Sequence, residues 1–223
     1  IRESRVLSTQ NIVAALGGLS IKPKVFICAS AIGFYGDRGD KTLTEQSVPG
    51  QGFLSEVCQE WEAAAATARA YDIRVVQVRI GVVLAAPNEG GALPQMLPIF
   101  KFGLGGNLGN GNQWFPWVHV DDVVGILQHA IFNEKVASPI NAVAPNPVTN
   151  AEFTQTLAAV LHRPAFFAAP SFLLRLGLGE MADLLLGSTR VLPELAQATG
   201  YQFKFPLLRP ALTNLLIPAN SDT

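Results

Sequence analysis

The sequence predicts an α/β fold in which helices cover a parallel sheet, with a smaller α+β subdomain after it. Short, nearly continuous apolar runs rich in β-branched residues occupy 24–30 and 73–84, a pattern typical of strands covered on both faces. A helix-forming segment, 52–71, lies between them, so the three make a βαβ unit with a right-handed crossover. After about residue 150 the alternation ends and the sequence becomes helix-rich.

The first element that we expect is a helix. Its apolar residues have helical spacing and end at Gly17 and Gly18; they are Val6, Ile12, Val13 and Leu16. No strand precedes this helix, although a parallel sheet of this kind normally begins with one. We therefore expect that the natural protein has a further segment upstream of Ile1.

The middle of the chain predicts a helix, a glycine-rich segment and a further strand–helix pair. The 52–71 helix has an apolar face formed by Phe53, Val57, Trp61 and Ala64. Residues 85–116 are too rich in glycine and proline for regular structure throughout, and predict either a binding loop or a surface connection. Next, "WVHVDDVVGILQHAIFN" predicts a short strand and a helix with two aspartates in its first turn, and 139–144 predicts another strand.

The C-terminal third begins with a strong helix signal. Thr149 and Glu152 have the spacing of a capping box, and Pro164 is expected to stop the helix that they start. Beyond it we expect mainly helices, a stop at Gly200, a strand over 201–205 and a last helix. We divide the chain into a sheet-containing domain, 1–150, and a C-terminal substrate or cap subdomain, 151–223.

Composition limits the partners. Sixteen basic and seventeen acidic residues give a net charge of -1 without a basic run, so nucleic acid is a poor candidate partner. No apolar run approaches the roughly 18 residues that span a bilayer, so we expect no membrane partner. The two cysteines form no CxxC motif or disulfide framework, which predicts a reducing, cytoplasmic location. A small molecule is the expected ligand.

Three motifs carry the chemistry. The sequence has no GxGxxG, HExxH or GxSxG motif, and its histidines suggest no metal cluster. In order along the chain it has "ASAIGFYGD" and "RIGVVL" at strand ends and "FPWVHVDDVV" after the glycine-rich segment. Together these resemble the extended short-chain dehydrogenase/reductases that include nucleoside-diphosphate-sugar epimerases. More narrowly, "GFLSEVCQEWEAAA" and "LLLGSTRVLP" resemble an atypical branch, the epimerase-family or SulA-like proteins, which has a C-terminal domain of unassigned function.

The resemblance implies a Rossmann-like doubly wound parallel sheet whose first strands, with the glycine-rich turn for the dinucleotide pyrophosphate, would precede Ile1. It implies NADP or NAD as cofactor and a small hydroxyl or carbonyl substrate, and it admits a homodimer. Ser30 matches the family serine that hydrogen-bonds the reacting group, and Tyr35 matches a tyrosine beside the substrate, so both are assigned as catalytic. The alternatives are a serine that caps a turn and a tyrosine ring that packs.

The resemblance also assigns cofactor contacts. Ala29 and Ser30 end the first strand, Arg79 ends the next, and Gly81 and Val82 would present their backbone near the nicotinamide. A buried salt bridge is the alternative for Arg79. Arg5, at the start of the first helix, is the last assigned contact, and a solvated arginine is its alternative.

Two departures from the family pattern put catalysis in doubt. The Tyr-x-x-x-Lys motif, in which lysine lowers the tyrosine pKa, is absent, and its positions fall on Phe53 and Val57. Phe115 stands where nucleotide-sugar enzymes often carry an arginine that clamps a diphosphate, so we expect nucleotide sugars to bind poorly. Two functions stay open: an NAD(P)-dependent oxidoreductase or epimerase-like protein, in which Glu56 could assist, and a catalytically silent dinucleotide-binding sensor or regulator.

Overall fold

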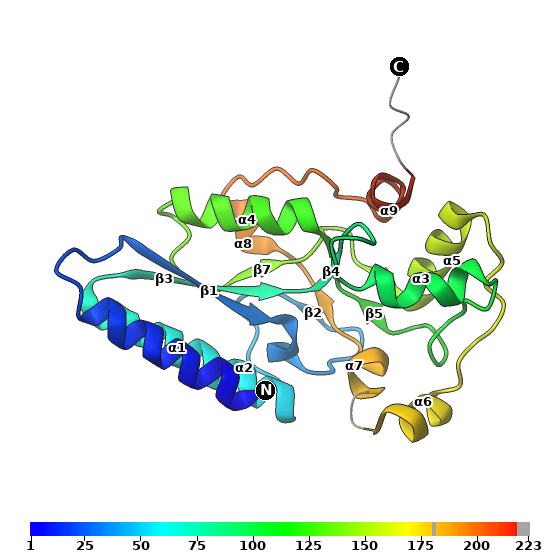
Figure 1. The fold of residues 1–223 in the computed structure, drawn as a ribbon, viewed down its shortest axis with the longest axis horizontal. Coiled ribbons are helices and arrows are strands. Elements are labelled where there is room, and N and C mark those ends of the chain that lie inside the picture. The colour runs from blue at the N-terminus through cyan, green and yellow to red at the C-terminus, as the bar shows by residue number, and fades with distance from the viewer. Residues whose placement is uncertain (180–181, 218–223) are drawn as a thin grey trace, which may run out of the picture.

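A computed structural model describes residues 1–179 and 182–217 and has a parallel sheet between two layers of helices (Figure 1). The sheet has the order β1-β3-β7, with β1 at Val25–Ala31, β3 at Arg74–Ile80 and β7 at Ile140–Ala142. In Figure 1, α1 (Arg2–Gly17) and α2 (Phe53–Ala66) lie on one side of this sheet, and α4 (Val120–Phe132) and α8 (Glu194–Ala198) lie on the other. The predicted α/β class is confirmed.

The βαβ unit forms as predicted because its apolar faces meet. Helix α2 is followed by a 3-10 helix, η2 (Thr67–Tyr71), which together cover most of the expected 52–71. Val13 of α1, Ala65 of α2 and Val75 of β3 belong to one buried cluster between the helices and the sheet. The first helix also ends at Gly17 as expected, although Ile12 of its apolar stripe is half exposed.

The predicted strand over 73–84 is in fact two strands. β3 ends at Ile80, and β4 (Val82–Leu84) leaves the central sheet to pair with β6 (Trp117–His119). At the break, the Gly81 amide donates to the Ala142 carbonyl and the Val82 amide donates to the Pro116 carbonyl at 2.7 Å. The chain therefore changes partners at Gly81, which a continuous apolar run does not reveal.

The glycine-rich segment is only partly irregular. It contains α3 (Leu93–Lys101) and β5 (Trp114–Phe115), and β5 pairs antiparallel with β8 (Val148–Thr149). The capping box is confirmed: Thr149 accepts from the Glu152 amide, and Glu152 accepts from the Thr149 amide, at the start of α5 (Asn150–Leu161). This helix ends at Leu161 in a left-handed His162, before Pro164.

The strand expected over 201–205 is wrong: this segment is irregular. The carboxylate of Asp122, in the first turn of α4, accepts from the amides of Lys204 and Phe205 at 2.8 and 2.9 Å and from the Tyr201 hydroxyl. These amides are therefore satisfied by a side chain rather than by a neighbouring strand. The stop at Gly200 is confirmed by its positive φ of 90°.

The remaining elements are short. They are η1 (Ile32–Tyr35), β2 (Thr42–Leu43), α6 (Ser171–Leu178), α7 (Ala182–Leu186), β9 (Arg190–Val191) and α9 (Leu208–Leu216). β2 pairs in parallel with β9, which joins the segment after β1 to the C-terminal region. Among the described residues no helix has both the length and the apolarity to cross a bilayer.

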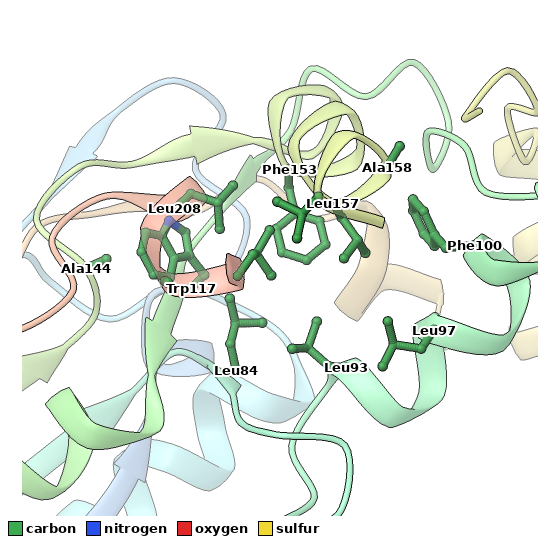
Figure 2. Close-up of a cluster of buried hydrophobic side chains, with 13 residues drawn as sticks. Leu84, Leu93, Leu97, Phe100, Trp117, Ala144, Phe153, Leu157, Ala158 and Leu208 are labelled. Carbon is green, nitrogen blue, oxygen red and sulfur yellow. The ribbon is translucent and has the colours of Figure 1, made fainter. Parts of the chain in front are cut away.

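The largest buried cluster lies between α3, α5, α9 and the β4–β6 pair (Figure 2). Trp117 and Phe153 are both buried in it, although they stand on opposite sides of the predicted boundary at residue 150. The division into 1–150 and 151–223 stays a prediction, and the last six residues of the second unit lie outside the described part.

Candidate functional site

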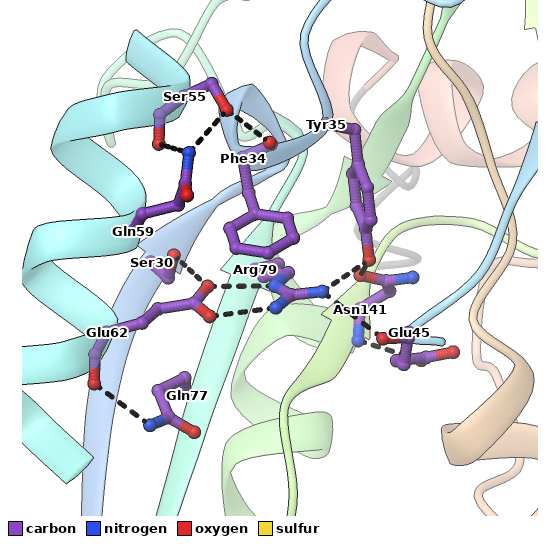
Figure 3. A network of polar contacts seen from close by, with 10 residues as sticks. All are labelled: Ser30, Phe34, Tyr35, Glu45, Ser55, Gln59, Glu62, Gln77, Arg79 and Asn141. Carbon is purple, nitrogen blue, oxygen red and sulfur yellow. Dashed lines mark hydrogen bonds and ion pairs between the residues drawn. The ribbon is translucent and has the colours of Figure 1, made fainter. Parts of the chain in front are cut away.

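A buried ion pair lies where β1, β3 and α2 meet (Figure 3). Arg79, on β3, donates from Nε to Glu62 Oε1 and from Nη2 to Glu62 Oε2, both at 2.8 Å. The arginine side chain is only 4% exposed and the Glu62 side chain 11%. Burial by itself would lower the pKa of Arg79, but the bonds from Glu62 outweigh it and raise the pKa. The guanidinium is therefore charged, and its two bonds to Glu62 hold α2 to the sheet.

Tyr35 continues this network towards β7. Its hydroxyl donates to Asn141 Oδ1 at 2.7 Å and accepts from Arg79 Nη1 at 3.0 Å. The guanidinium carbon of Arg79 lies 3.5 Å from the centre of the Phe34 ring, which packs edge-on against Tyr35. Tyr35 is fully buried, and burial raises the pKa of its phenol. The phenol is therefore neutral and fixed in position.

Two further groups complete the network. Ser30, on β1, donates its hydroxyl to Glu62 Oε1 at 2.7 Å. Glu45 accepts the Asn141 amide at 2.9 Å through Oε1, and burial raises the pKa of its carboxyl. Figure 3 shows that these side chains come from the helix and from all three strands of the central sheet, or from the loops next to them.

The structure brings together three of the predicted site residues, Ser30, Tyr35 and Arg79, and does not bring in the others. Ala29 is exposed on β1, beside Ser30. Gly81 and Val82 follow Arg79 in the chain, but their amides are bonded to carbonyls of the neighbouring segments. Arg5 is exposed on α1, with its guanidinium 5.3 Å from the Trp61 ring. Whether any of these residues binds a cofactor stays a prediction.

The positions of the missing Tyr-x-x-x-Lys pair have a clear structural role. Val57 is buried in α2, whereas Phe53, in the first turn, is half exposed with the Arg2 guanidinium 5.7 Å from its ring centre. Phe115 packs against Phe153, with 4.4 Å between their ring centres, at the edge of the large apolar cluster. Phe115 therefore packs in the apolar cluster at the position where nucleotide-sugar enzymes often carry the arginine that binds a diphosphate.

A cavity of about 730 Å³ is lined in part by Asp37, Gly39 and Asp40, in the loop that follows Tyr35. It is formed by the loop after η1, by the glycine-rich segment and by α6, and its polar lining includes Asp37, Asp40, Asn110, Asn112, Gln113 and Ser188. Hydrogen bonds fix two of these residues in place: Trp114 Nε1 donates to Asp40, and Gln113 Nε2 donates to the carbonyls of Leu108 and Leu185. At least part of the glycine-rich segment thus lines a space large enough for a small ligand.

Sequence reasoning missed Glu62, Asn141 and Glu45. Asn141 had a usable signal, because it is a polar residue within the apolar strand "PINAVA", and buried polar side chains need partners. Glu62 had no comparable signal, since a glutamate in an alanine-rich helix is normally solvated. Among the described residues, no group of three His, Cys, Asp or Glu side chains could hold a metal ion.

Together, the helix-covered parallel sheet and the polar residues at its strand ends define an α/β protein of the nucleotide-binding class. The profile of the NAD dependent epimerase/dehydratase family matches residues 1–142, and a domain of unknown function (DUF1731) matches residues 169–215. The chain belongs to the NAD dependent epimerase/dehydratase family, as the sequence motifs predicted.

Individual relatives also place the chain in this family. The chain is 38% identical to the human epimerase family protein SDR39U1 (isoform2), solved with NADPH, with a TM-score of 0.90 over 96% of this chain and 72% of that one. It is 39% identical to Bacillus subtilis YfhF over 97% of this chain and 71% of the relative. It is 40% identical to the chloroplastic SDR39U1 homolog of Arabidopsis thaliana over 97% of this chain but only 62% of that protein. The Rossmann-like fold is thereby confirmed.

Proposed function

We propose that this protein binds NADP(H) or NAD(H) and acts through that binding, without a proton relay of its own. Family membership and the NADPH in the human relative support the dinucleotide. The fit to this chain rests on the carboxyl ends of β1 and β3, where ligands of open α/β sheets bind. There Ala29 is small and exposed, and Gly81 lies two residues after Arg79. When bound, the dinucleotide would supply hydride chemistry.

The observation that carries this proposal is that both candidate proton donors are already bonded inside the protein. Ser30 donates to Glu62, and Tyr35 donates to Asn141. A tyrosine that transfers a proton near neutral pH needs a lowered pKa, whereas burial raises the pKa of Tyr35. In this proposal Ser30 and Tyr35 stabilise the site through these hydrogen bonds and do not transfer protons.

A second candidate is an NAD(P)-dependent oxidoreductase or epimerase-like enzyme for a small hydroxyl or carbonyl compound. The 730 Å³ cavity favours it, because Asp37 and Asp40, which line the cavity, lie two and five residues after Tyr35 in the chain. A substrate held there would need Tyr35 to exchange its bond to Asn141 for one to the substrate.

Calorimetry with NADPH and NADH tests the dinucleotide proposal, and it fails if neither binds to the chain or to a version extended like its longer relatives. Single-turnover oxidation of bound NADPH by a panel of small aldehydes and ketones, followed by absorbance, then separates the two candidates. We expect no turnover, and Tyr35→Phe to leave dinucleotide affinity unchanged. Turnover that Tyr35→Phe abolishes, while the control Tyr71→Phe retains it, would establish the enzyme instead.

We also propose a reducing, cytoplasmic location. Cys28 and Cys58 are both free and buried, and burial raises the pKa of both thiols, which keeps them unreactive. Fractionation of the source cells with an antibody to the chain tests this, and recovery from an oxidising compartment or an organelle would contradict it.

A further inference from the structure

Large apolar side chains are exposed together at one end of the molecule. Phe102 is 81% exposed, Phe166 87% and Leu176 82%. With three less exposed neighbours they form a set that we call the apolar end: Phe102, Leu104, Phe166, Phe167, Leu173 and Leu176. Scattered single apolar residues are normal on protein surfaces, but a gathering of this size marks an interaction site.

These residues come from three segments, of which the first two lie side by side and the third follows the second in the chain. The stretch after α3 runs along the stretch before α6: the Phe167 amide donates to the Gly105 carbonyl at 3.3 Å, and the Ala169 amide donates to the Asn107 carbonyl at 2.8 Å. Helix α6 follows directly, and Figure 1 shows α6 and the end of α3 at the same end of the molecule, far from α1. None of the six side chains lines the 730 Å³ cavity, so the cavity ligand does not account for their exposure.

Two exposed cations lie beside the phenylalanine-bearing segments of the apolar end. Lys101 and Arg163 are exposed beside Phe102 and Pro164, and neither forms an ion pair with a described residue. The sequence has no aspartate or glutamate from 90 to 120 or from 153 to 179. Lys101 and Arg163 therefore favour a partner that carries negative charge.

This charge separates the conceivable occupants. A two-fold dimer formed through this end would bring the lysines and arginines of both copies into one interface, where like charges repel each other. A fluid anionic surface attracts both cations and accepts protruding phenylalanines without needing a matching shape.

We propose that the apolar end docks the protein on the surface of a bilayer that contains anionic phospholipid. The phenylalanine and leucine side chains enter the boundary between headgroups and acyl chains, while Lys101 and Arg163 meet the lipid phosphates. This proposal departs from the expectation of no membrane partner, which rested only on the lack of an apolar run long enough to span a bilayer. Docking on a surface needs no such run. This proposal is independent of the dinucleotide site.

The test is sedimentation of the purified full chain with vesicles of phosphatidylcholine and phosphatidylserine, compared with vesicles of phosphatidylcholine alone. We expect binding to the anionic vesicles that weakens as salt is raised. The double variant Phe166→Ser with Phe167→Ser should bind about tenfold more weakly, because it removes apolar area from the docking surface. Lys101→Glu with Arg163→Glu should also lower binding, by about tenfold or more.

Matched controls lie elsewhere on the surface. Phe132, on α4, is 83% exposed, and Lys135 follows it in the next turn, so Phe132→Ser and Lys135→Glu change the same residue types outside the apolar end. Both should bind anionic vesicles like the unchanged chain. The proposal is overturned if the unchanged chain does not bind, if the controls lose binding as the test variants do, or if sedimentation velocity shows a dimer that Phe166→Ser with Phe167→Ser dissociates.

Discussion

Replacing Glu62 by alanine should be among the most damaging single changes in this protein. Its two carboxylate oxygens accept from Arg79 Nε, Arg79 Nη2 and the Ser30 hydroxyl, all at 2.7–2.8 Å. The variant would leave the Arg79 guanidinium buried without its counter-charge. Removing one partner of a buried pair costs about 3–5 kcal/mol of unfolding free energy, a large part of the roughly 5–15 kcal/mol typical of a domain.

The assay is urea unfolding of both proteins, followed by far-UV circular dichroism. With a denaturant slope of about 2–3 kcal/mol per molar urea, the midpoint should fall by about 1–2 M. The same helix offers a matched control, because Glu60 pairs with Arg2 at 3.1 Å where both side chains are more than 40% exposed. Glu60→Ala should therefore cost less than about 1 kcal/mol.

A double-mutant cycle then isolates the pair. Glu62→Leu combined with Arg79→Met removes both charges, so its cost should be clearly smaller than the sum of the two single costs. Our account of the buried network is refuted if Glu62→Ala unfolds at the same urea concentration as Glu60→Ala. Strictly additive costs in the cycle would refute it as well.

Three further predictions concern other sites. Burial lowers the pKa of His119, so as the pH falls the unfolded chain binds a proton at this histidine before the folded chain does. The unfolding free energy should therefore fall as the pH drops below the ordinary histidine pKa near 6.5, and should fall less in His119→Asn. An unfolding free energy that does not change with pH would contradict this. Gly81→Ala should lower the unfolding free energy, measured by thermal unfolding, by about 1–3 kcal/mol, because a Cβ there would lie 2.4 Å from the Pro116 carbonyl oxygen. An unchanged unfolding free energy would show that the neighbouring strands can move apart to accept the methyl group. Thr149→Ala should cost about 1 kcal/mol, since the Glu152 amide loses its acceptor, whereas Thr149→Ser should keep most of the stability.

The sequence predicts best those features that depend on neighbours along the chain. The capping box involves two residues a turn apart, and both of its bonds form. The βαβ unit also follows from local patterns, because a buried strand and an amphipathic helix each show their period in a short window. The absence of Tyr-x-x-x-Lys can likewise be read directly, and so can the resemblance that the family match later confirmed.

Two errors share a physical cause, which is competition from groups distant in the chain. The apolar run over 73–84 breaks at Gly81 because carbonyls of Pro116 and Ala142 take the amides at that point. The β-branched pattern on either side is the same, so it contains no sign of the change of partner. The aromatic segment 201–205 forms no strand because the carboxylate of Asp122 accepts its amides instead.

The sequence by itself determined the α/β class, the order of the main elements, the family and the loss of the proton-transfer motif, because each of these is written in residue types at short range. Only the tertiary structure decided what Ser30, Tyr35 and Arg79 contact. Their partners, Glu62 and Asn141, stand 17 to 106 residues away along the chain. In the folded protein the bonded atoms lie within 3 Å, because a buried charged or polar group is costly unless it has a partner.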